Sequence, residues 1–408
     1  MPDPEAVIRF ENSKQGFNGV LVLDSTLLGP GSGGVRILPD VNEAEVNLLA
    51  QVMTRKNAFF SIPAGGAKTG IAFDPRSGSR VKVIADFGAA VSDLIRELQY
   101  VPSPDMGSTE SDIIAIYRQL GSESLLRNSI LKKTVDCIPL ARLCTAEGVV
   151  EAVVTSIRMT GNRIENSSVA IEGFGRLGRL IGTMLVERGL KICAVSSEEQ
   201  ALFQKGGIDI GLISDSKQRP GLTAFEDYVR TTPLAEIREP SAIVDESVDV
   251  LIPSARPLLV TKSDIDKVQA KLIVPCANAP VSESAEAPLA ERGILVIPDF
   301  VANAGGVLGG FLCRLNVPTD ALRSVVRRKI HDGVMLVLEC PNGSTPGELA
   351  RRVVDEQLEG ARGHPYKHRL RFLWHWKRFL SRPGGISAAS WYVRRRLSVK
   401  WYQSFASR

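Results

Sequence analysis

The chain has 408 residues, which is longer than one hydrophobic core usually grows, so we expect two domains. Hydrophobic residues make up 44% and charged residues 23%, an ordinary globular composition that argues against a disordered or fibrous chain. No apolar run reaches the ~18–20 residues that a membrane span requires, and the acidic amino-terminal stretch carries no secretory signal. We therefore expect a cytoplasmic protein.

The cysteines and histidines limit the kinds of metal site and catalysis that the chain can support. The six cysteines are scattered, with no CxxC pair and no histidine at a metal-binding spacing. This pattern predicts buried thiols in a reducing compartment and no metal site. Only four histidines are present and three of them lie beyond residue 360, so catalysis in the body of the chain would use Lys, Asp, Ser or a cofactor.

The net charge of +5 is unevenly distributed. Residues 362–408 contain twelve Lys and Arg, no acid and all four tryptophans, and subtracting those twelve charges from +5 leaves −7 for the rest of the chain. An acidic body argues against nucleic acid binding. We expect a boundary near residue 361 and a poorly ordered basic aromatic tail at 362–408. As alternatives, that tail could contact a membrane surface or an anionic polymer such as a nucleic acid.

In chain order, a strand is predicted at 19–25 (GVLVLDS), followed by a glycine-rich loop at 29–36 (GPGSGGVR). A helix is then expected from Asn42 or Glu43 towards Phe60. Its apolar face comprises Val46, Leu49, Ala50, Met53 and Phe60. Lys56 lies at the edge of this face, where a lysine ordinarily reaches to the surface.

A second glycine-rich loop is expected at 62–71 (IPAGGAKTGI), with Lys68 near its end. Its glycines would let backbone approach a ligand, and Lys68 would present a cation. The same pattern also suits a tight turn with a solvated lysine. The spacing does not fit a P-loop.

Asp105 lies between an extended, Pro-containing stretch and a glycine in the segment 101–113. It could act as an acid or base, or serve only in a turn or as a cap. Ser108 or Thr109 is expected to begin the next helix.

Residues 167–189 carry the clearest cofactor signal. A buried strand leads to Gly173-x-Gly175-x-x-Gly178 and an apolar-striped helix, and a further strand follows at 190–196. This order is typical of a dinucleotide-binding fold, because the glycines permit a tight turn and the helix amino terminus attracts a pyrophosphate. The expected cofactor-binding turn comprises Gly173, Phe174, Gly175, Arg176, Leu177 and Gly178.

The residue that ends the second strand often distinguishes NAD from NADP. Ser197 stands where an acid would accept the ribose hydroxyls, and Glu198 follows one position later. No arginine is adjacent in sequence to bind a 2′-phosphate. The choice between NAD and NADP stays open, with a slight preference for NAD or dual use.

Several co-linear segments together resemble the Glu/Leu/Phe/Val dehydrogenase family. They are MTRKNA (53–58), GGAKTGI (65–71), PDMG (104–107), IPLARLCTAEG (138–148), GFGRLG (173–178), KLIVPCANAP (271–280) and PDFVANAGGV (298–307). The resemblance covers roughly residues 10–361. It implies reversible, NAD(P)-dependent oxidative deamination of an L-amino acid to the 2-oxo acid and ammonia, in an oligomeric enzyme.

The resemblance also implies individual roles. Lys56 would bind the substrate α-carboxylate, Lys68 would polarise the reacting carbon's substituent and the attacking water, and Asp105 would exchange protons. Cofactor contacts would come, in the second domain, from Thr145, Asn278 and Asn303. Screening from solvent beside another cation should lower the pKa of Lys68, which suits acid–base work near neutrality.

Glutamate-specific members carry a lysine and a serine for the side-chain carboxylate, at positions that here correspond to Ser32 and Gly310. Without them a second carboxylate would be buried unpaired, at a cost of several kcal/mol. The expected substrate-binding residues are therefore Lys56, Gly34, Ser32 and Gly310, around a neutral side chain such as that of Leu, Val or Phe. Glutamate bound through a different cation remains the alternative.

The resemblance predicts a two-domain α/β fold. A substrate-binding and oligomerisation domain would span 1–137 and be completed by 321–361, including a helix at 345–360, and a doubly wound Rossmann domain would span 138–320. Substrate would lie in the cleft between them. Pro275 and Cys276 depart from the family pattern, which leaves a non-catalytic, dinucleotide-sensing regulator as a rival.

Overall fold

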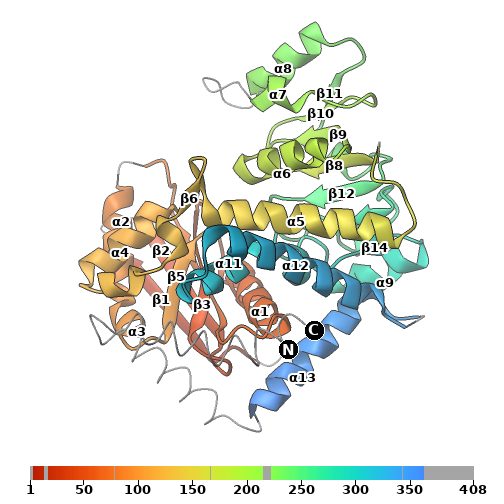
Figure 1. Cartoon of the computed structure of the whole chain (residues 1–408). Helices are drawn as coiled ribbons and strands as arrows, with labels where there is room; N and C mark the ends of the chain where they lie inside the picture. Colours follow the sequence, from red (N-terminus) through yellow and green to blue (C-terminus); the bar gives the residue numbers. More distant parts are fainter. Residues whose placement is uncertain are drawn as a thin grey trace. The chain divides into compact units, whose positions relative to one another are not determined.

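The computed structural model describes residues 3–12, 17–77, 79–165, 167–214, 222–341 and 343–362, and these form two compact units (Figure 1). Of these residues, those within 1–140, 307–322 and 353–362 form unit 1, and those within 141–306 and 323–352 form unit 2. The expected return segment 321–361 is thus divided between the units. The expected tail lies outside the described residues, apart from Arg362.

Unit 1 is built on a five-stranded sheet with the order β1-β2-β4-β3-β5, in which β3 is parallel to both β4 and β5. Its strands are β1 (Ala6–Asn12), β2 (Phe17–Ser25), β3 (Gly31–Leu38), β4 (Gly65–Ala72) and β5 (Tyr100–Pro104). Its other elements are α1 (Glu43–Phe59), α2 (Arg80–Ala90), α3 (Ser92–Arg96), α4 (Glu110–Gln119), η1 (Glu123–Leu126), η2 (Ile130–Lys132), β6 (Thr134–Val135) and β7 (Ile138–Pro139).

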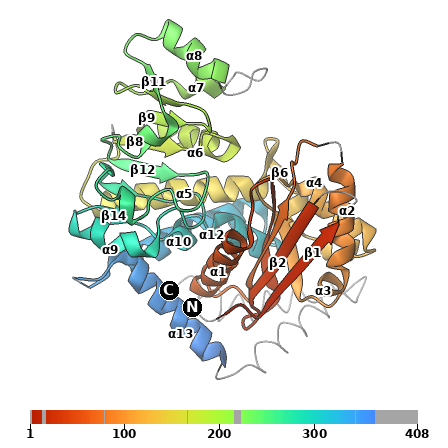
Figure 2. The same cartoon turned by 180° about the vertical axis from the view of Figure 1, so that it is seen from behind.

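Helices cover both faces of this sheet (Figure 2). Side chains alternate between the faces along a strand, so Val20 and Val22 of β2 pack under α1 while Leu21 and Leu23 face α2 and α4. The expected helix is confirmed as α1, and the Asn42 side chain caps it by accepting from the Glu45 N–H at 3.0 Å. We refer below to the side of the sheet under α1 as the α1 face.

The two glycine-rich segments are strands and not the loops we expected. They form β3 and β4, which lie beside each other in the sheet. Glycine disfavours strands in isolation, but here α1 approaches β4 so closely that a Cβ at Gly66 would come within 2.3 Å of the Thr54 backbone nitrogen. The glycines allow the helix to lie against the strand, so tertiary packing overrides local propensity.

Unit 2 contains a seven-stranded sheet with the order β11-β10-β9-β8-β12-β13-β14. Strands β8, β9, β12, β13 and β14 are parallel, and in the sheet β8 lies between β9 and β12, so the winding direction reverses at β8. This is the predicted doubly wound arrangement. Two short antiparallel strands, β10 and β11, extend its edge.

The elements of unit 2 follow the chain to residue 302. They are α5 (Leu140–Met159), β8 (Ser168–Glu172), α6 (Arg176–Glu187), β9 (Lys191–Ser196), β10 (Ala201–Phe203), α7 (Ile210–Ser214), α8 (Leu222–Thr231), β11 (Glu236–Arg238), η3 (Pro240–Ile243), β12 (Val250–Pro253), η4 (Lys262–Asp264), β13 (Leu272–Ile273), α9 (Glu283–Glu291), β14 (Leu295–Val296) and α10 (Asp299–Ala302). The last three helices, α11 (Gly305–Arg314), α12 (Thr319–Leu338) and α13 (Pro346–Arg362), each contribute residues to both units.

Four of the six cysteines are buried free thiols as expected, but Cys137 is exposed and Cys340 is half-buried. Within the described ranges, every helix is too short or too polar to cross a bilayer.

Candidate active site

The candidate site of unit 1 lies on the α1 face, where three residues of β3 point the same way. Val35 and Ile37 face α2 and α4, so the alternate positions Ser32, Gly34 and Arg36 face α1. Ser32 is half-buried and Arg36 is buried. Glycine at position 34 leaves room for a side chain from the end of β5.

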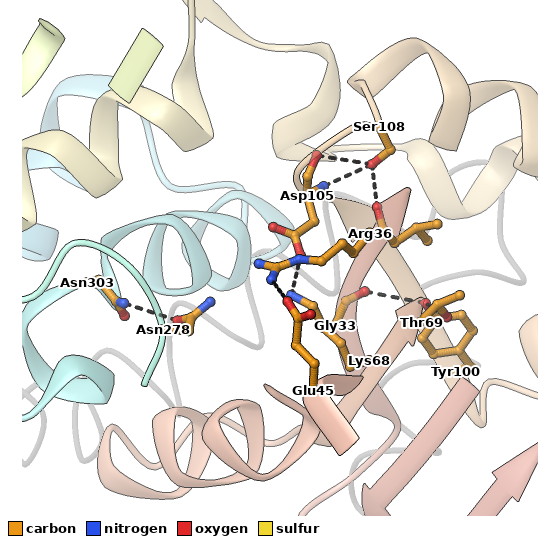
Figure 3. Close-up of polar contacts among 11 residues, drawn as sticks. Gly33, Arg36, Glu45, Lys68, Thr69, Tyr100, Asp105, Ser108, Asn278 and Asn303 are labelled. Carbon is orange, nitrogen blue, oxygen red and sulfur yellow. Dashed lines mark hydrogen bonds and ion pairs between the residues drawn. The ribbon is translucent and has the colours of Figure 1, made fainter. Parts of the chain in front are cut away.

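Lys68 and Asp105 meet at this place (Figure 3). Lys68 projects from the centre of β4 on the α1 face, and Asp105 directly follows β5. The Lys68 Nζ lies 2.5 Å from the Asp105 Oδ2, and the Lys68 side chain is only 3% exposed. The structure thus brings together the two residues expected to be catalytic, from positions that are distant in sequence.

Arg36 joins the same cluster. Its Nε donates to the Asp105 Oδ2 at 3.1 Å, and its guanidinium also forms an ion pair with Glu45 in the first turn of α1 (Figure 3). The cluster therefore contains two cations and two carboxylates, which balance one another in a site that is largely shielded from water.

The segment that holds Asp105 is fixed by its own hydrogen bonds. The Ser108 hydroxyl donates to the Val35 carbonyl at 2.6 Å and accepts from the Asp105 N–H at 2.9 Å. Thr109 caps α4 in a reciprocal pair with Asp112, which confirms one of the two expected helix starts. Asp105 is therefore held to β3, and it is not the cap of that helix.

Burial and neighbouring charges shift the pKa values of both Lys68 and Asp105. Burial lowers the pKa of Lys68, the nearby Arg36 charge lowers it further, and Asp105 opposes this by raising it. For Asp105 burial acts to raise the pKa, but the positive charges of Lys68 and Arg36 hold it well below its ordinary value. Asp105 is ionised at neutral pH, and Lys68 loses its proton more easily than an exposed lysine.

The helix pattern alone suggested that Lys56 reaches the surface, but the residue is buried. It lies in the last turn of α1 with only 4% of the residue exposed, because this helix packs against the sheet along its length. The neighbouring Asn57 amide donates to the Gly65 carbonyl at 2.7 Å and so links the same turn to β4.

Gly310, the other position expected to select the substrate, lies on α11 within unit 1. A Cβ there would be 3.7 Å from the Ile130 side chain, an ordinary van der Waals distance, so the site would accept a small side chain. One turn along, burial raises the pKa of the Cys313 thiol, and the nearby Lys133 charge acts to lower it.

The turn between β8 and α6 suits a dinucleotide. Gly173 has a φ of +84°, and its N–H and that of Phe174 donate to Ser196 at the end of β9. A Cβ at Gly178 would lie 2.4 Å from the Gly173 carbonyl oxygen, so helix and strand pack as closely as the motif requires. A Cβ at Gly175 would meet no atom within 4 Å, which leaves open space for a phosphate beside the amino terminus of α6.

The remaining residues of this turn differ in exposure. Phe174 is buried, Arg176 is exposed and Leu177 is half-buried. After β9, the Ser197 hydroxyl donates to the Gln200 carbonyl and accepts from the Gln200 N–H, both at 3.1 Å, which closes a tight turn, while Glu198 is exposed.

The other three expected cofactor contacts also lie in unit 2. The Asn303 amide nitrogen donates to the Cys276 and Ala277 carbonyls and, at 3.0 Å, to the Asn278 side-chain oxygen (Figure 3). Asn303 and Asn278 are therefore held together. The Thr145 hydroxyl, on α5, donates to the Ala141 carbonyl at 2.9 Å.

The sequence did not single out three residues that organise these sites. Arg36 donates to Asp105 and is itself paired with Glu45, and Glu172 accepts from the N–H groups of Ser254 and Ala255 at 3.1 and 3.0 Å. Glu172 thereby links the ends of β8 and β12 at the point where the winding reverses. A signal for Arg36 existed in the sequence, since a charged residue between Val35 and Ile37 marks the second face of a strand, but it required recognising the segment as a strand.

Comparison with known proteins agrees with this geometry. Residues 140–313 match the Glutamate/Leucine/Phenylalanine/Valine dehydrogenase family and residues 4–122 match the Glu/Leu/Phe/Val dehydrogenase dimerisation domain. A catabolic NAD-specific glutamate dehydrogenase of Bacillus subtilis is 30% identical over 303 residues, which is 71% of this chain and 69% of that protein. An NADP(+)-dependent glutamate dehydrogenase of Pyrobaculum calidifontis is 32% identical over 324 residues, 75% of this chain and 74% of that protein.

A hetero-hexameric glutamate dehydrogenase from Thermus thermophilus has a similar fold, with a TM-score of 0.73 and 22% identity over 88% of this chain and 89% of that one. Both halves of the chain match, in order, and the strands of the two large sheets, the turn at Gly173 and the pair of Lys68 and Asp105 lie within the matched segments. The chain therefore belongs to the Glutamate/Leucine/Phenylalanine/Valine dehydrogenase family and is an amino acid dehydrogenase.

Proposed function

We propose that this enzyme catalyses the reversible, NAD(P)-dependent oxidative deamination of an L-amino acid with a neutral side chain, such as Leu, Val or Phe. The observation that carries the proposal is the buried pair of Lys68 and Asp105, 2.5 Å apart on the α1 face. The relatives use NAD or NADP, and the turn at Gly173–Gly178 fits either dinucleotide. The bound cofactor would supply the acceptor for the hydride that leaves the substrate Cα.

The chain's own residues would do the rest. Lys56 pairs with the substrate carboxylate. Asp105, which is ionised, accepts a proton from the substrate amino group and later returns one, and Lys68, with its lowered pKa, activates the water that adds to the oxidised carbon. Thr145, Asn278 and Asn303 orient the reacting end of the cofactor. Neither regulation without turnover nor nucleic acid binding requires such a pair.

The choice of a neutral side chain rests on the charges of β3. Arg36 is the cation that this strand places on the α1 face, and it is already paired with two carboxylates, Glu45 and Asp105. Ser32 and Gly34, its neighbours on that face, carry no charge. A substrate with a second carboxylate would bring a third anion to one guanidinium, whereas an apolar side chain requires no cation.

Glutamate is the second candidate, because Lys133, which follows η2, lies near Cys313, and Cys313 is on α11, the helix that carries Gly310. The test is to measure kcat/KM for leucine, valine, phenylalanine and glutamate, with NAD and with NADP. We expect a neutral amino acid to exceed glutamate by roughly a hundredfold, which corresponds to ~2.7 kcal/mol. A preference for glutamate that Lys133→Gln abolishes would overturn the neutral-substrate proposal and identify the cation.

We further infer a homo-oligomer that acts in the cytoplasm. The free thiols of the described chain suit a reducing compartment. Light scattering of the purified protein tests the assembly, and a monomer would contradict it.

A further inference from the structure

We propose that Arg36 is a positioning residue: anchored by Glu45 of α1, it orients the Asp105 carboxylate towards Lys68 and sets the balance of charge around the Lys68 amine. The inference rests on the proposed function only in that Lys68 and Asp105 transfer the protons. It does not depend on which amino acid is the substrate.

The geometry of the Asp105 carboxylate carries the first part. One oxygen, Oδ2, lies 2.5 Å from the Lys68 Nζ and 3.1 Å from the Arg36 Nε. A guanidinium is planar and presents its donors in a fixed fork, so fixing one edge fixes the direction of the other. Glu45 holds another nitrogen of the same group, Nη1. The rotation of the Asp105 carboxylate is therefore set from α1 through Arg36.

Burial strengthens the effect that these four charged side chains have on one another. The Arg36 and Lys68 side chains are 4% and 3% exposed, and those of Glu45 and Asp105 are 15% and 16% exposed. Water screens the four charges only weakly, so each strongly affects the others. Removing one charge leaves the cluster unbalanced, and Lys68 is the member that can respond, by gaining or losing a proton.

The groups that face the Lys68 amine come from each neighbouring element. Arg36 of β3 lowers its pKa, whereas Asp105 after β5 and Glu45 of α1 raise it. Loss of the Arg36 charge should therefore raise the pKa of Lys68, and loss of the Glu45 charge should lower it.

These opposite expected shifts in the pKa of Lys68 can be tested by experiment. We would prepare Arg36→Gln, Arg36→Lys and Glu45→Gln and measure the pH midpoint of Lys68 acetylation by acetic anhydride, by mass spectrometry, in full-length protein without substrate or cofactor. We expect a higher midpoint for Arg36→Gln and a lower one for Glu45→Gln. Arg36→Lys keeps the charge but not the fork, so its midpoint should stay near that of the wild type.

Steady-state kinetics on the best wild-type substrate provide the second readout. Arg36→Gln should lower kcat by roughly ten- to hundredfold with little change in KM, because the proton acceptor is misoriented but substrate binding is retained. The lower limb of the pH profile of kcat/KM should move with the acetylation midpoint. Arg36→Lys should recover part of the lost kcat.

A matched control exists on the same helix. Glu43, two residues before Glu45, pairs with Arg9, whose side chain is 67% exposed. Glu43→Gln and Arg9→Gln remove the same charges from a solvated pair and should leave both the midpoint and kcat unchanged. Shifts in the same direction for Arg36→Gln and Glu45→Gln, or shifts no larger than those of the controls, would overturn the proposal.

The experiment still tests the role of Arg36 if one variant fails to fold or if the proposed substrate is wrong. If Arg36→Gln does not fold, the isosteric Glu45→Gln, compared with Glu43→Gln, still decides: a lowered midpoint supports the proposal and an unchanged one rejects it. If the enzyme prefers glutamate, the proposed substrate is wrong, but the midpoints are measured without substrate and still test Arg36.

Discussion

Gly34 packs directly against Asp105: a methyl group at position 34 would lie 2.7 Å from the Asp105 Cβ and 3.3 Å from its carboxyl carbon. The absence of a side chain at this one position of β3 allows the carboxylate to lie between Lys68 and Arg36. Because the Pro104 carbonyl oxygen would lie 3.2 Å from the same methyl group, the strand has little room to yield.

We therefore expect Gly34→Ala to displace Asp105 and to lower kcat by roughly ten- to hundredfold, the scale of a misplacement of about 1 Å at a reacting group. Gly88→Ala is the control, since its methyl group would meet only side chains of α4 at 3.2 Å or more. Steady-state kinetics and thermal unfolding of both variants check this. Equal kcat values in the two variants would contradict it.

The local features of this fold could be predicted from the sequence. The turn at Gly173, the capped start of α1 and the capped start of α4 each depend on residues within a few positions of one another. The strands at 31–38 and 65–72 could not be predicted in the same way, because glycine counts against a strand until the partner strand and α1 are known. The helix pattern alone suggested a surface position for Lys56, which is buried, because the burial of a helical residue depends on what packs against the helix.

The candidate site likewise contains some residues that could be predicted from the sequence and others that could not. Lys68 and Asp105 stood out through their resemblance to family motifs, whereas Arg36 lies 69 positions from Asp105 and its role appears only when β3 and β5 pair. Glu45 looked like an ordinary acid in the first turn of a helix, where such residues are common. Arg36, with which it pairs, comes from a strand that the sequence alone did not reveal.

The lowered pKa of Asp105 predicts how acid affects stability. Its pKa is lower in the folded than in the unfolded state, so its contribution to folding is full above the unfolded pKa of about 3.9 and is lost as the pH falls through the folded value. Asp105→Asn lacks this contribution. The difference in free energy of unfolding between wild type and Asp105→Asn should therefore be larger at pH 7 than at pH 3.5, in urea titrations.

Asp74→Asn is the control for that series. Hydrogen bonds from Arg76 lower the pKa of Asp74 too, but this carboxylate is solvated, and surface pairs of this kind contribute little to stability. The control should differ little from wild type at either pH. An Asp105→Asn difference that stays constant with pH would show that the pair does not stabilise the fold through its charge.

Ser32→Lys should change the substrate preference. Position 32 faces the same side of β3 as Gly34 and Arg36, and a lysine there would provide the cation that Arg36, already paired, does not. We expect kcat/KM for glutamate to rise at least about tenfold, equivalent to ~1.4 kcal/mol, and that for leucine to fall. Ser32→Met, of similar length but uncharged, is the control. An equal effect of both variants on glutamate turnover would indicate that size and not charge matters at this position.

Substitutions at two glycines of the dinucleotide turn should affect cofactor binding and protein stability differently. A methyl group at Gly175 would meet nothing in the protein, so Gly175→Ala should unfold at the wild-type temperature but bind NADH or NADPH at least about tenfold more weakly, because the methyl group occupies the space of the pyrophosphate. At Gly178 the methyl group would lie 2.4 Å from the Gly173 carbonyl oxygen, so Gly178→Ala should lose both thermal stability and affinity.

Gly182→Ala, on the same helix with ordinary contacts of 3.4 Å or more, should lose neither. Fluorescence titration with each reduced cofactor and thermal unfolding distinguish the three variants. If Gly175→Ala bound both cofactors as tightly as wild type, the pyrophosphate would not approach this turn. The open space at position 175 would then have no part in cofactor binding, and the assignment of the turn would fail even though its backbone has the expected form.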